Sequence, residues 1–471
     1  IPPTSDLLGR TADANYSGGI FNILIDNGDP LTEITGTTTI IDGRTQTAYS
    51  GNTNSGTLGA GGTAVGTSLA VLPNYERPEI QINKNNGDVI STSGDNVVIR
   101  NVSIFAGNNA GVIINGGTGT ISNSLLGVNA TGVNAGNIDF GVEVIGGSAT
   151  IDSNYITMNS NAGVLVNGGT VTIIQNNHIT GNGTGACFDN IRLQNGSGIN
   201  INHNLIDNAA ASGIDADGIV GNVLIEENTI RNSGQDGGNC SGTIENVGIR
   251  LDGDNSSIRN NIITSNGGAG IVLVGGNSSG NLISQNSIYA NGTAGNALGI
   301  DLDPTDNMGD GVTLNEIGDT DNGPNGLLNF PIITGAFVSG SNLIVEGWSR
   351  PGAIIELFLT DVNQGSATAG DNQLGMVTDY GEGQTYLATF TEGSGADTAS
   401  GSSAYTDLDG NTDNTNRYRV VIPLPSGVTR GDIVTSTATI ANSTSEFSPI
   451  SIVSSYTVIT NRRITYRVKK E

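Results

Sequence analysis

The sequence has little charge, few aromatic rings and few histidines or cysteines. Charged residues make up 13% and aromatic residues 4% of its 471 residues, with 12 prolines, 2 histidines and 2 cysteines. Disordered chains are usually richer in charge and proline, whereas this chain keeps an apolar content of 36%. The scarcity therefore argues against disorder and favours a folded chain.

Positive charge is especially scarce. Lysine and arginine number 18 against 44 aspartates and glutamates, which gives a formal net charge of −26. Nucleic-acid binding needs clustered positive charge, so this balance excludes nucleic acid as a partner and disfavours anionic membranes. No apolar run reaches the ~18 residues of a membrane-spanning helix. The composition favours an extracellular or bacterial cell-surface setting, with divalent cations and glycans as ligands.

The two cysteines, Cys187 and Cys240, each lie in a glycine-rich insertion just before an equivalent predicted strand. In an extracellular chain this arrangement favours one disulfide that joins two loops on the same flank of the molecule. The alternative is two free thiols.

An internal repeat decides the architecture. The pattern I-x-x-N-x-I recurs with its asparagine at Asn154, Asn177, Asn204, Asn228, Asn261 and Asn286, and a second asparagine follows each, at Asn159, Asn182, Asn208, Asn232, Asn266 and Asn291. A second motif, Gly followed by Ile or Val, opens another short strand in each repeat, with Asn190 in place of the glycine in one of them. A period of about 22 residues with β-branched alternation predicts β-coils rather than helical repeats.

The two asparagine columns have a physical role in such a stack. Successive coils pair their backbones about 4.8 Å apart, and their inward Ile and Val side chains form one continuous core. Asparagine tolerates the left-handed conformation of sharp bends, and its stacked amides form hydrogen-bonded ladders. We therefore interpret both asparagine columns as structural rather than as a binding site.

Three segments carry a family resemblance. They are residues 21–53, which begin FNILIDNGDP, residues 299–334, which begin GIDLDPTDN and include NFPII, and residues 437–449, TATIANSTSEFSP. With the repeat between them, the chain resembles bacterial secreted proteins of the pectin-lyase-like superfamily. The resemblance implies an all-β chain, in which a right-handed parallel β-helix is followed by a small antiparallel, Ig-like β-sandwich. The superfamily holds enzymes and non-enzymes alike, so the fold does not choose between them.

The pattern divides the chain into four parts. Residues 1–90 form an N-terminal cap with the first coils, and residues 91–326 form the β-helix with an acidic exit segment. Residues 327–455 form the sandwich, and residues 456–471 form a basic terminal strand. Sandwich strands are expected at residues 343–348, 353–359, 374–378, 386–391, 418–424 and 433–440.

One outward strip of the predicted coils carries charge. The Gly-Ile motif places Arg192, Asp215 and Arg250 at equivalent outward positions on successive coils, with Asp217 and Asp252 two residues further along. Such a strip is either an ion-pair ladder or a groove in which arginines bind the carboxylates of an acidic glycan. Arg192, Asp215 and Arg250 are also the catalytic candidates for a polysaccharide lyase or hydrolase. The catalytic motifs of the polygalacturonase-like enzymes in this superfamily are absent from the sequence.

Two aspartate-rich segments predict metal sites. Asp319 and Asp321 precede Gly323, and Asp407, Asp409 and Asp413 surround Gly410. Alternating carboxylates around a glycine turn can converge on one hard cation, so both segments are candidate calcium sites. Neither matches a complete EF-hand, and the alternative is an acidic solvated surface.

The last strand concentrates positive charge. Its basic residues are Arg462, Arg463, Arg467, Lys469 and Lys470. The segment is either a solvated terminal strand or a docking element for an acidic neighbour, such as the next subunit of an assembly.

Two hypotheses of function follow. The first is a non-catalytic surface, adhesin, matrix or filament protein in which the β-helix is a stiff rod, either single or assembled end to end. The second is a polysaccharide lyase or hydrolase acting on acidic glycans through the Arg192, Asp215 and Arg250 strip. In both, the partners are an extracellular glycan or neighbouring copies of the chain.

Overall fold

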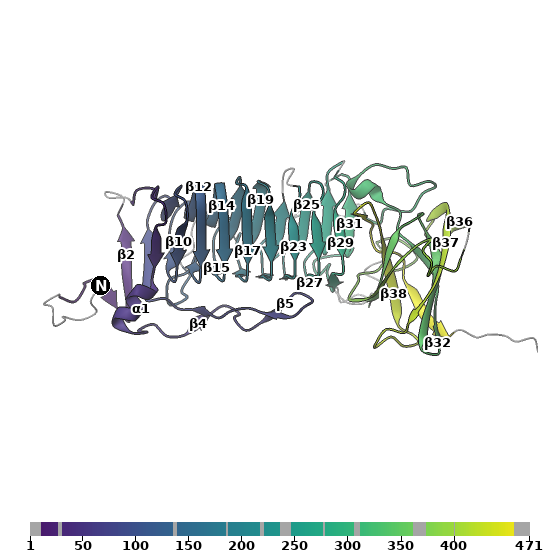
Figure 1. The fold of residues 1–471 in the computed structure, drawn as a ribbon, viewed down its shortest axis with the longest axis horizontal. Coiled ribbons are helices and arrows are strands. Elements are labelled where there is room, and N and C mark those ends of the chain that lie inside the picture. The colour runs from purple at the N-terminus through teal and green to yellow at the C-terminus, as the bar shows by residue number, and fades with distance from the viewer. Residues whose placement is uncertain are drawn as a thin grey trace, which may run out of the picture.

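The chain forms a rod of stacked β-coils with a second β-domain on its C-terminal end (Figure 1). The computed structural model describes residues 11–26, 31–134, 139–184, 187–216, 221–235, 246–276, 278–305, 311–360, 374–399 and 401–455. Within these ranges almost every element is a strand. The all-β prediction is therefore confirmed.

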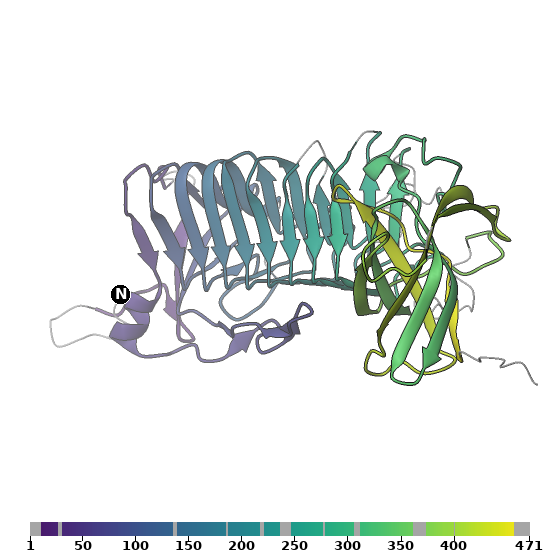
Figure 2. The same ribbon diagram turned by 45° about the vertical axis from the view of Figure 1, so that its right-hand side comes forward.

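Each coil of the rod contributes strands to three columns, and Figure 2 shows the strands of successive coils side by side. The first column consists of β9 (Ile90–Thr92), the first half of β12 (Ala110–Ser122), the first half of β14 (Phe140–Asp152), β16 (Val164–Asn167), β19 (Ile191–Asn195), β22 (Ile214–Ala216), β25 (Ile249–Asp252), β28 (Ile271–Val274) and β31 (Ile300–Asp303). The second column consists of β3 (Ile40–Asp42), β10 (Val97–Arg100), the second halves of β12 and β14, β17 (Val171–Gln175), β20 (Ile199–Asn202), β23 (Leu224–Glu226), β26 (Ser257–Arg259) and β29 (Leu282–Ser284).

The third column is a separate 11-stranded sheet. It consists of β1 (Tyr16–Ser17), β2 (Ile20–Ile25), β8 (Ile80–Lys84), β11 (Ser103–Phe105), β13 (Leu125–Leu126), β15 (Tyr155–Thr157), β18 (His178–Thr180), β21 (Leu205–Asp207), β24 (Thr229–Arg231), β27 (Ile262–Thr264) and β30 (Ser287–Tyr289). Apart from the antiparallel β1–β2 pair, its strands are parallel, as in the register Ile156–Ile179–Ile206. These isoleucines point into the rod and are fully buried.

Most first-column strands are opened by a glycine that close packing between coils requires. A Cβ atom at Gly213 would lie 2.7 Å from the carbonyl oxygen of Gly248, and one at Gly248 would lie 2.6 Å from that of Gly270. A larger residue would push adjacent coils apart. The Gly-Ile motif therefore marks where a strand begins and also allows adjacent coils to pack closely.

The first asparagine column forms the predicted ladder. Asn177 donates its backbone N–H and its side-chain Nδ2–H to Oδ1 of Asn204, at 2.9 and 3.0 Å, and Asn204 repeats both bonds with Asn228. These amides are fully buried, and the second Nδ2 hydrogen reaches a backbone carbonyl, as in the 2.8 Å bond from Asn177 to Ile151. Buried polar groups stabilise a fold only when they are paired, and this column meets that condition.

The second asparagine column differs from its prediction at two places. Asn182 donates its side-chain Nδ2–H to Asn190 rather than to Asn208. The hydrogen bond to Asn266 Oδ1 comes from the backbone N–H of Ser233 rather than from Asn232. Asn208 and Asn232 instead adopt positive φ angles of 53° and 54°. These two asparagines serve the bend itself, because asparagine accepts a left-handed backbone.

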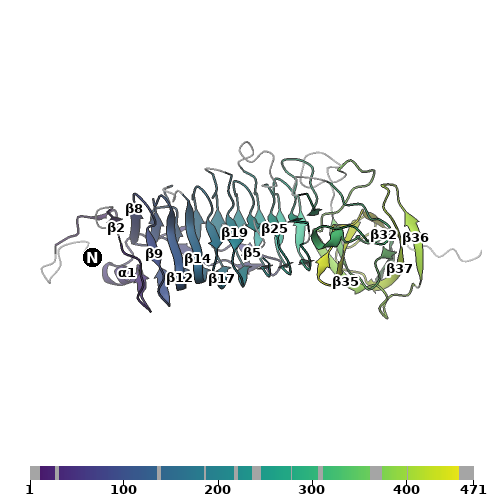
Figure 3. The ribbon, with the colours of Figure 1, turned by 90° about the horizontal axis from the view of Figure 1, so that it is seen from above.

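An arm, residues 52–78, leaves the N-terminal cap and runs along the outer face of the third column (Figures 1 and 3). It follows α1 (Arg44–Ser50) and contains two short antiparallel pairs, β4 (Thr57–Leu58) with β7 (Tyr75–Glu76) and β5 (Ala64–Val65) with β6 (Ala70–Val71). Val65 and Leu72 of the arm pack on Leu205 of β21. In the described ranges no helix is long and apolar enough to span a membrane.

The C-terminal domain has two packed faces around its own apolar core. Its strands are β32 (Ile332–Ser339), β33 (Asn342–Ser349), β34 (Ile354–Thr360), β35 (Thr385–Thr391), β36 (Ser402–Thr406), β37 (Thr412–Pro423), β38 (Ile433–Ile440), β39 (Ser443–Thr444) and β40 (Ser451–Ser455), after the short 3-10 helix η1 (Pro324–Leu327). Most pairs are antiparallel, but β40 runs parallel to β32 and joins the two faces into one continuous sheet. The strand expected at residues 374–378 is a turn.

The C-terminal domain closes the open end of the last coil. Phe358 and Phe447 belong to the core of the rod and meet edge to face, with ring centroids 5.5 Å apart. Glu382 accepts a 2.7 Å hydrogen bond from Asn291 Nδ2, and so takes the place of the next asparagine in the ladder. Glu356 accepts the backbone N–H of Gln285 at 2.9 Å. The two parts are therefore joined by buried hydrogen bonds and by a shared core.

Candidate functional site

The charged strip lies on the first column in the order expected. Leu165, Arg192, Asp215, Arg250, Val272 and Asp301 are register partners on successive coils. Asp252 pairs with Val274 in the same register, and Asp217 lies outside the described residues.

The strip is a covered ion-pair ladder rather than an open groove. Arg250 Nη1 lies 2.9 Å from Asp215 Oδ1, and Arg192 Nη1 lies 3.9 Å from Asp215 Oδ2 and 3.4 Å from Asp189. The Asp215 side chain is 1% exposed and those of Arg192 and Arg250 are 14% and 11% exposed. The guanidinium of Arg192 also lies 5.2 Å from the Phe188 ring centroid. These charges satisfy one another, which supports the structural interpretation.

A group of carboxyls at the other end of the first column was not foreseen. Glu143 occupies the same outward column on β14, two registers before Arg192, with Asp139 and Asp88 beside it. Burial and the negative charge of Asp88 raise the pKa of both Glu143 and Asp139. Asp88 is held by Asn109 Nδ2 at 2.6 Å and by the Ala110 N–H at 3.1 Å. Asp139 directly precedes β14, which carries Glu143, whereas Asp88 comes from an earlier part of the chain, so no contiguous sequence motif marks the group.

The arm covers a buried histidine. His178 on β18 accepts the Ala60 N–H at Nδ1, at 3.0 Å, and its Nε2 lies 3.1 Å from Asp207 Oδ1. These partners assign the proton of the neutral ring to Nε2. Burial raises the pKa of Asp207, but hydrogen bonds from His178 and Thr180 and the positive charge of Arg231 outweigh it and leave that pKa below its usual value. His178 thus anchors the arm, which the repeat pattern alone did not predict.

The first candidate calcium segment gathers three carboxylates. Oxygens of Glu316, Asp319 and Asp321 lie within 4.8 Å of one another. Burial and the Glu316 charge raise the pKa of Asp321 to about 6, and burial is also the main cause of a raised pKa at Asp319. Glu316 Oε2 and Asp321 Oδ1 have no hydrogen-bond partner in the described part of the chain. Glu316, which the motif omitted, completes a donor set of the oxygen type that calcium prefers.

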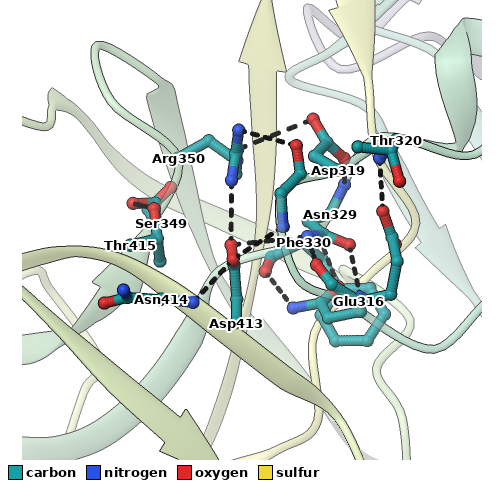
Figure 4. A network of polar contacts seen from close by, with 12 residues as sticks. Glu316, Asp319, Thr320, Asn329, Phe330, Ser349, Arg350, Asp413, Asn414 and Thr415 are labelled. Carbon is teal, nitrogen blue, oxygen red and sulfur yellow. Dashed lines mark hydrogen bonds and ion pairs between the residues drawn. The ribbon is translucent and has the colours of Figure 1, made fainter.

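The second candidate segment sends its carboxylates to separate partners. Asp413 lies 3.1 Å from Arg350 Nη1, and Arg350 also approaches Asp319 at 3.6 Å, so one arginine bridges the two segments (Figure 4). Asp407 accepts the N–H groups of Asp409 and Asn411 within its own turn, while Asp409 accepts that of Thr378. In the described ranges these three aspartates are not gathered into one ligand set.

Two other predicted groups fall wholly or partly outside the described residues. Cys187 is disulfide-bonded, and Cys240 lies outside the described ranges. Arg462, Arg463, Arg467, Lys469 and Lys470 also lie outside them.

Comparison with known proteins concerns the fold of the rod. Residues 140–307 match the family model described as "Right handed beta helix region". With the parallel register above, this makes the rod a right-handed parallel β-helix, as the resemblance predicted. Membership of the pectin-lyase-like superfamily and an Ig-like C-terminal domain stay predictions.

Three solved structures are similar in part. Full-length tailspike protein 2 of an Escherichia coli O157:H7 bacteriophage is 12% identical, with 76% of this chain covered and a TM-score of 0.32. This chain spans 57% of that protein's length. Pectate lyase Pel9A is 17% identical, with 47% of this chain and 64% of that chain covered and a TM-score of 0.30. The enzymatically active domain of bacteriophage CBA120 tailspike protein 2 is 12% identical, with coverages of 88% and 68% and a TM-score of 0.32.

Proposed function

We propose that the chain is a non-catalytic extracellular surface module, of the adhesin, matrix or filament kind, in which the β-helix is a rigid rod. The observation that carries this proposal is the closure of the last coil by the C-terminal domain. A buried hydrogen bond from Asn291 to Glu382 and a partly buried one from Gln285 to Glu356 join the two parts and support a stiff rod. A rod of fixed length and a net charge of −26 suit a protein that holds its ends apart in an aqueous environment.

End-to-end assembly is the second element of the proposal. The basic segment with Arg462, Arg463, Arg467, Lys469 and Lys470 is complementary in sign to the acidic remainder of the chain. Negative-stain imaging and light scattering of the full chain, and of a variant lacking residues 457–471, test it. We expect multimers or filaments from the full chain and single rods from the variant. The same species from both would exclude assembly through this segment.

Calcium is the ion proposed for the Glu316, Asp319 and Asp321 group. Its support is three convergent carboxylates, two of which have an oxygen without a partner in the described ranges. A divalent cation there would neutralise the mutual repulsion that contributes to the raised pKa of Asp321. Calcium is thus proposed to stabilise the junction of the rod and the C-terminal domain rather than to take part in catalysis.

Glycan cleavage is a second candidate, because of the Asp88, Asp139 and Glu143 group. Glycoside hydrolysis needs one carboxyl with a raised pKa as an acid and a second, ionised carboxylate. Glu143 is 9% exposed and has the raised pKa, while Asp88 is hydrogen-bonded as an acceptor. Release of reducing ends from a panel of polysaccharides, lost in Glu143→Gln, would support cleavage. Products made equally by that variant would rule out this group.

A further inference from the structure

A cavity lies where the arm, the last coils and the C-terminal domain meet. Its volume is about 350 Å³, within the usual size range of small-ligand pockets. We call it the junction cavity. Its lining comprises Thr67, Leu69, Asn260, Ile262, Gln285, Asn286, Ser287, Gln384, Thr385 and Tyr386.

The lining of the junction cavity carries no formal charge. A charged ligand placed there would lose water without gaining an opposite charge, whereas a neutral ligand avoids this penalty. The composition of the lining therefore selects for an uncharged ligand.

Polar side chains at the junction cavity have unused hydrogen-bonding capacity. The side-chain amides of Gln285 and Gln384 make no hydrogen bond within the described part of the chain. Each amide offers both a donor and an acceptor. Paired donors and acceptors without charge match the hydroxyl groups of a sugar.

Tyr386 supplies an aromatic surface. Its ring packs edge-on against Phe358, with centroids 5.9 Å apart, and 36% of the residue remains exposed. Its hydroxyl is engaged with Thr389 Oγ1 at 2.7 Å, so the ring rather than the hydroxyl is offered to a ligand. An aromatic face packs against the apolar C–H face of a sugar ring.

The walls of the junction cavity are fixed before any ligand arrives. The arm tip is held by the bond from the Thr67 N–H to the Asn260 carbonyl, at 3.0 Å. On the other side, Ser287 Oγ donates to the Gln384 carbonyl at 2.6 Å, and the Ile288 N–H donates to that of Gly383 at 2.9 Å. A preformed site loses less entropy when it binds a ligand.

From these four observations we infer that the junction cavity is a binding site for a neutral saccharide unit, with Tyr386 as its stacking platform. This deepens the proposed surface role, because it supplies an adhesive contact at the junction of the rod and the C-terminal domain. The site is separate from the Arg192–Asp215–Arg250 ladder, and it favours neutral over acidic sugars.

Saturation-transfer NMR and calorimetry with the full chain test this inference. The probes are maltotriose, cellotriose and chitotriose as neutral sugars and trigalacturonate as the acidic one. We expect at least one neutral probe to bind, with an affinity that falls 10-fold or more in Tyr386→Ala and is retained in Tyr386→Phe. Tyr49→Ala is the matched control, because Tyr49 is 44% exposed on α1 at the opposite end of the rod.

Three results would overturn the inference: no binding of any neutral probe, equal binding by Tyr386→Ala, or a preference for trigalacturonate. A melting temperature of Tyr386→Ala equal to that of the parent shows that any lost binding is local. Rod length and assembly are measured separately by imaging and light scattering, so failure of sugar binding leaves the rigid-rod proposal standing.

Discussion

At the scale of single residues, the structure separates charges that stabilise the coil stack from charges that remain available. Asp215 and Arg250 form a buried ion pair. Glu316 and Asp321, in contrast, each keep a buried carboxylate oxygen without a hydrogen-bond partner in the described ranges. The order of the ladder was predictable, because alternation along each strand fixes which side chain points outward. Its burial was not, since the neighbours that the fold brings to it, such as Phe188 against Arg192, are not part of the repeated motif.

The ladder makes a prediction about stability. Replacing Asp215 with Ala leaves Arg192 and Arg250 covered without their shared carboxylate, and losing one partner of a buried ion pair costs about 3 to 5 kcal/mol. We expect a loss of that size in the free energy of unfolding by urea. Glu226→Ala is the control: its pair with Arg259, at 2.8 Å, is more exposed and worth under about 1 kcal/mol. Equal losses in both variants would contradict a structural ladder.

Asp321 makes a prediction about pH. Its pKa is about 6 in the fold against an ordinary value of 3.8, so between these values the folded chain binds more protons than the unfolded chain. The contribution of this group to stability therefore falls as pH rises from about 4 to 6. In EDTA, we expect Asp321→Asn to remove this part of the decline in melting temperature over that range.

Calcium should reverse the behaviour of Asp321. Above pH 6 the ionised group binds the cation, so added calcium should raise the melting temperature of the parent and not that of Asp321→Asn. Glu76→Gln, which alters an exposed carboxylate in the arm, should keep the full calcium response. A parent melting temperature that calcium leaves unchanged would reject the site.

At the scale of elements, the repeat predicted the coils but not the arm. Two glycines of the arm are required because the arm lies very close to the rod: a Cβ atom at Gly59 would be 2.7 Å from the Tyr155 ring, and one at Gly66 would clash with Glu227. Glycine required by contact looks the same in a sequence as glycine in a loop. Likewise, the expected strand at residues 374–378 is a turn because Asp409, far along the chain, accepts the backbone N–H of Thr378.

Docking of the arm can be tested with two valines of one hairpin. Val65 is fully buried against Leu72 and Leu205, whereas Val71 is 68% exposed. An aspartate at position 65 would bury an unpaired charge, so the arm should detach from the third column. In Val65→Asp we expect proteinase K to cleave the arm at least 10-fold faster while the β-sheet circular dichroism persists. Val71→Asp should match the parent, and equal cleavage rates in all three proteins would exclude arm docking through Val65.

At the scale of the whole molecule, rigidity depends on how the C-terminal domain completes the last coil. An open β-helix end exposes unpaired backbone groups and asparagine amides, and these must be capped. Here the cap is a folded domain, which supplies Glu382 to Asn291, Glu356 to Gln285, and Phe447 to the core of the rod. The family resemblance predicted that such a domain follows the rod, but not that its carboxylates extend the asparagine ladder.

Removing the Glu382 carboxylate should therefore separate the motions of the two parts. In Glu382→Ala the Asn291 amide loses its 2.7 Å acceptor in a buried setting, which costs about 1 to 3 kcal/mol at the interface alone. We expect small-angle scattering to change from that of one rigid rod to that of two jointed bodies, and calorimetry to resolve two transitions. Glu392→Ala is the matched control, because that buried carboxylate accepts from Gly352 and Asn416 inside the C-terminal domain. Glu392→Ala should lower the stability of the C-terminal domain without changing the scattering profile of the rod. A rigid profile for Glu382→Ala would mean that the apolar contact of Phe358 and Phe447 alone holds the two parts together.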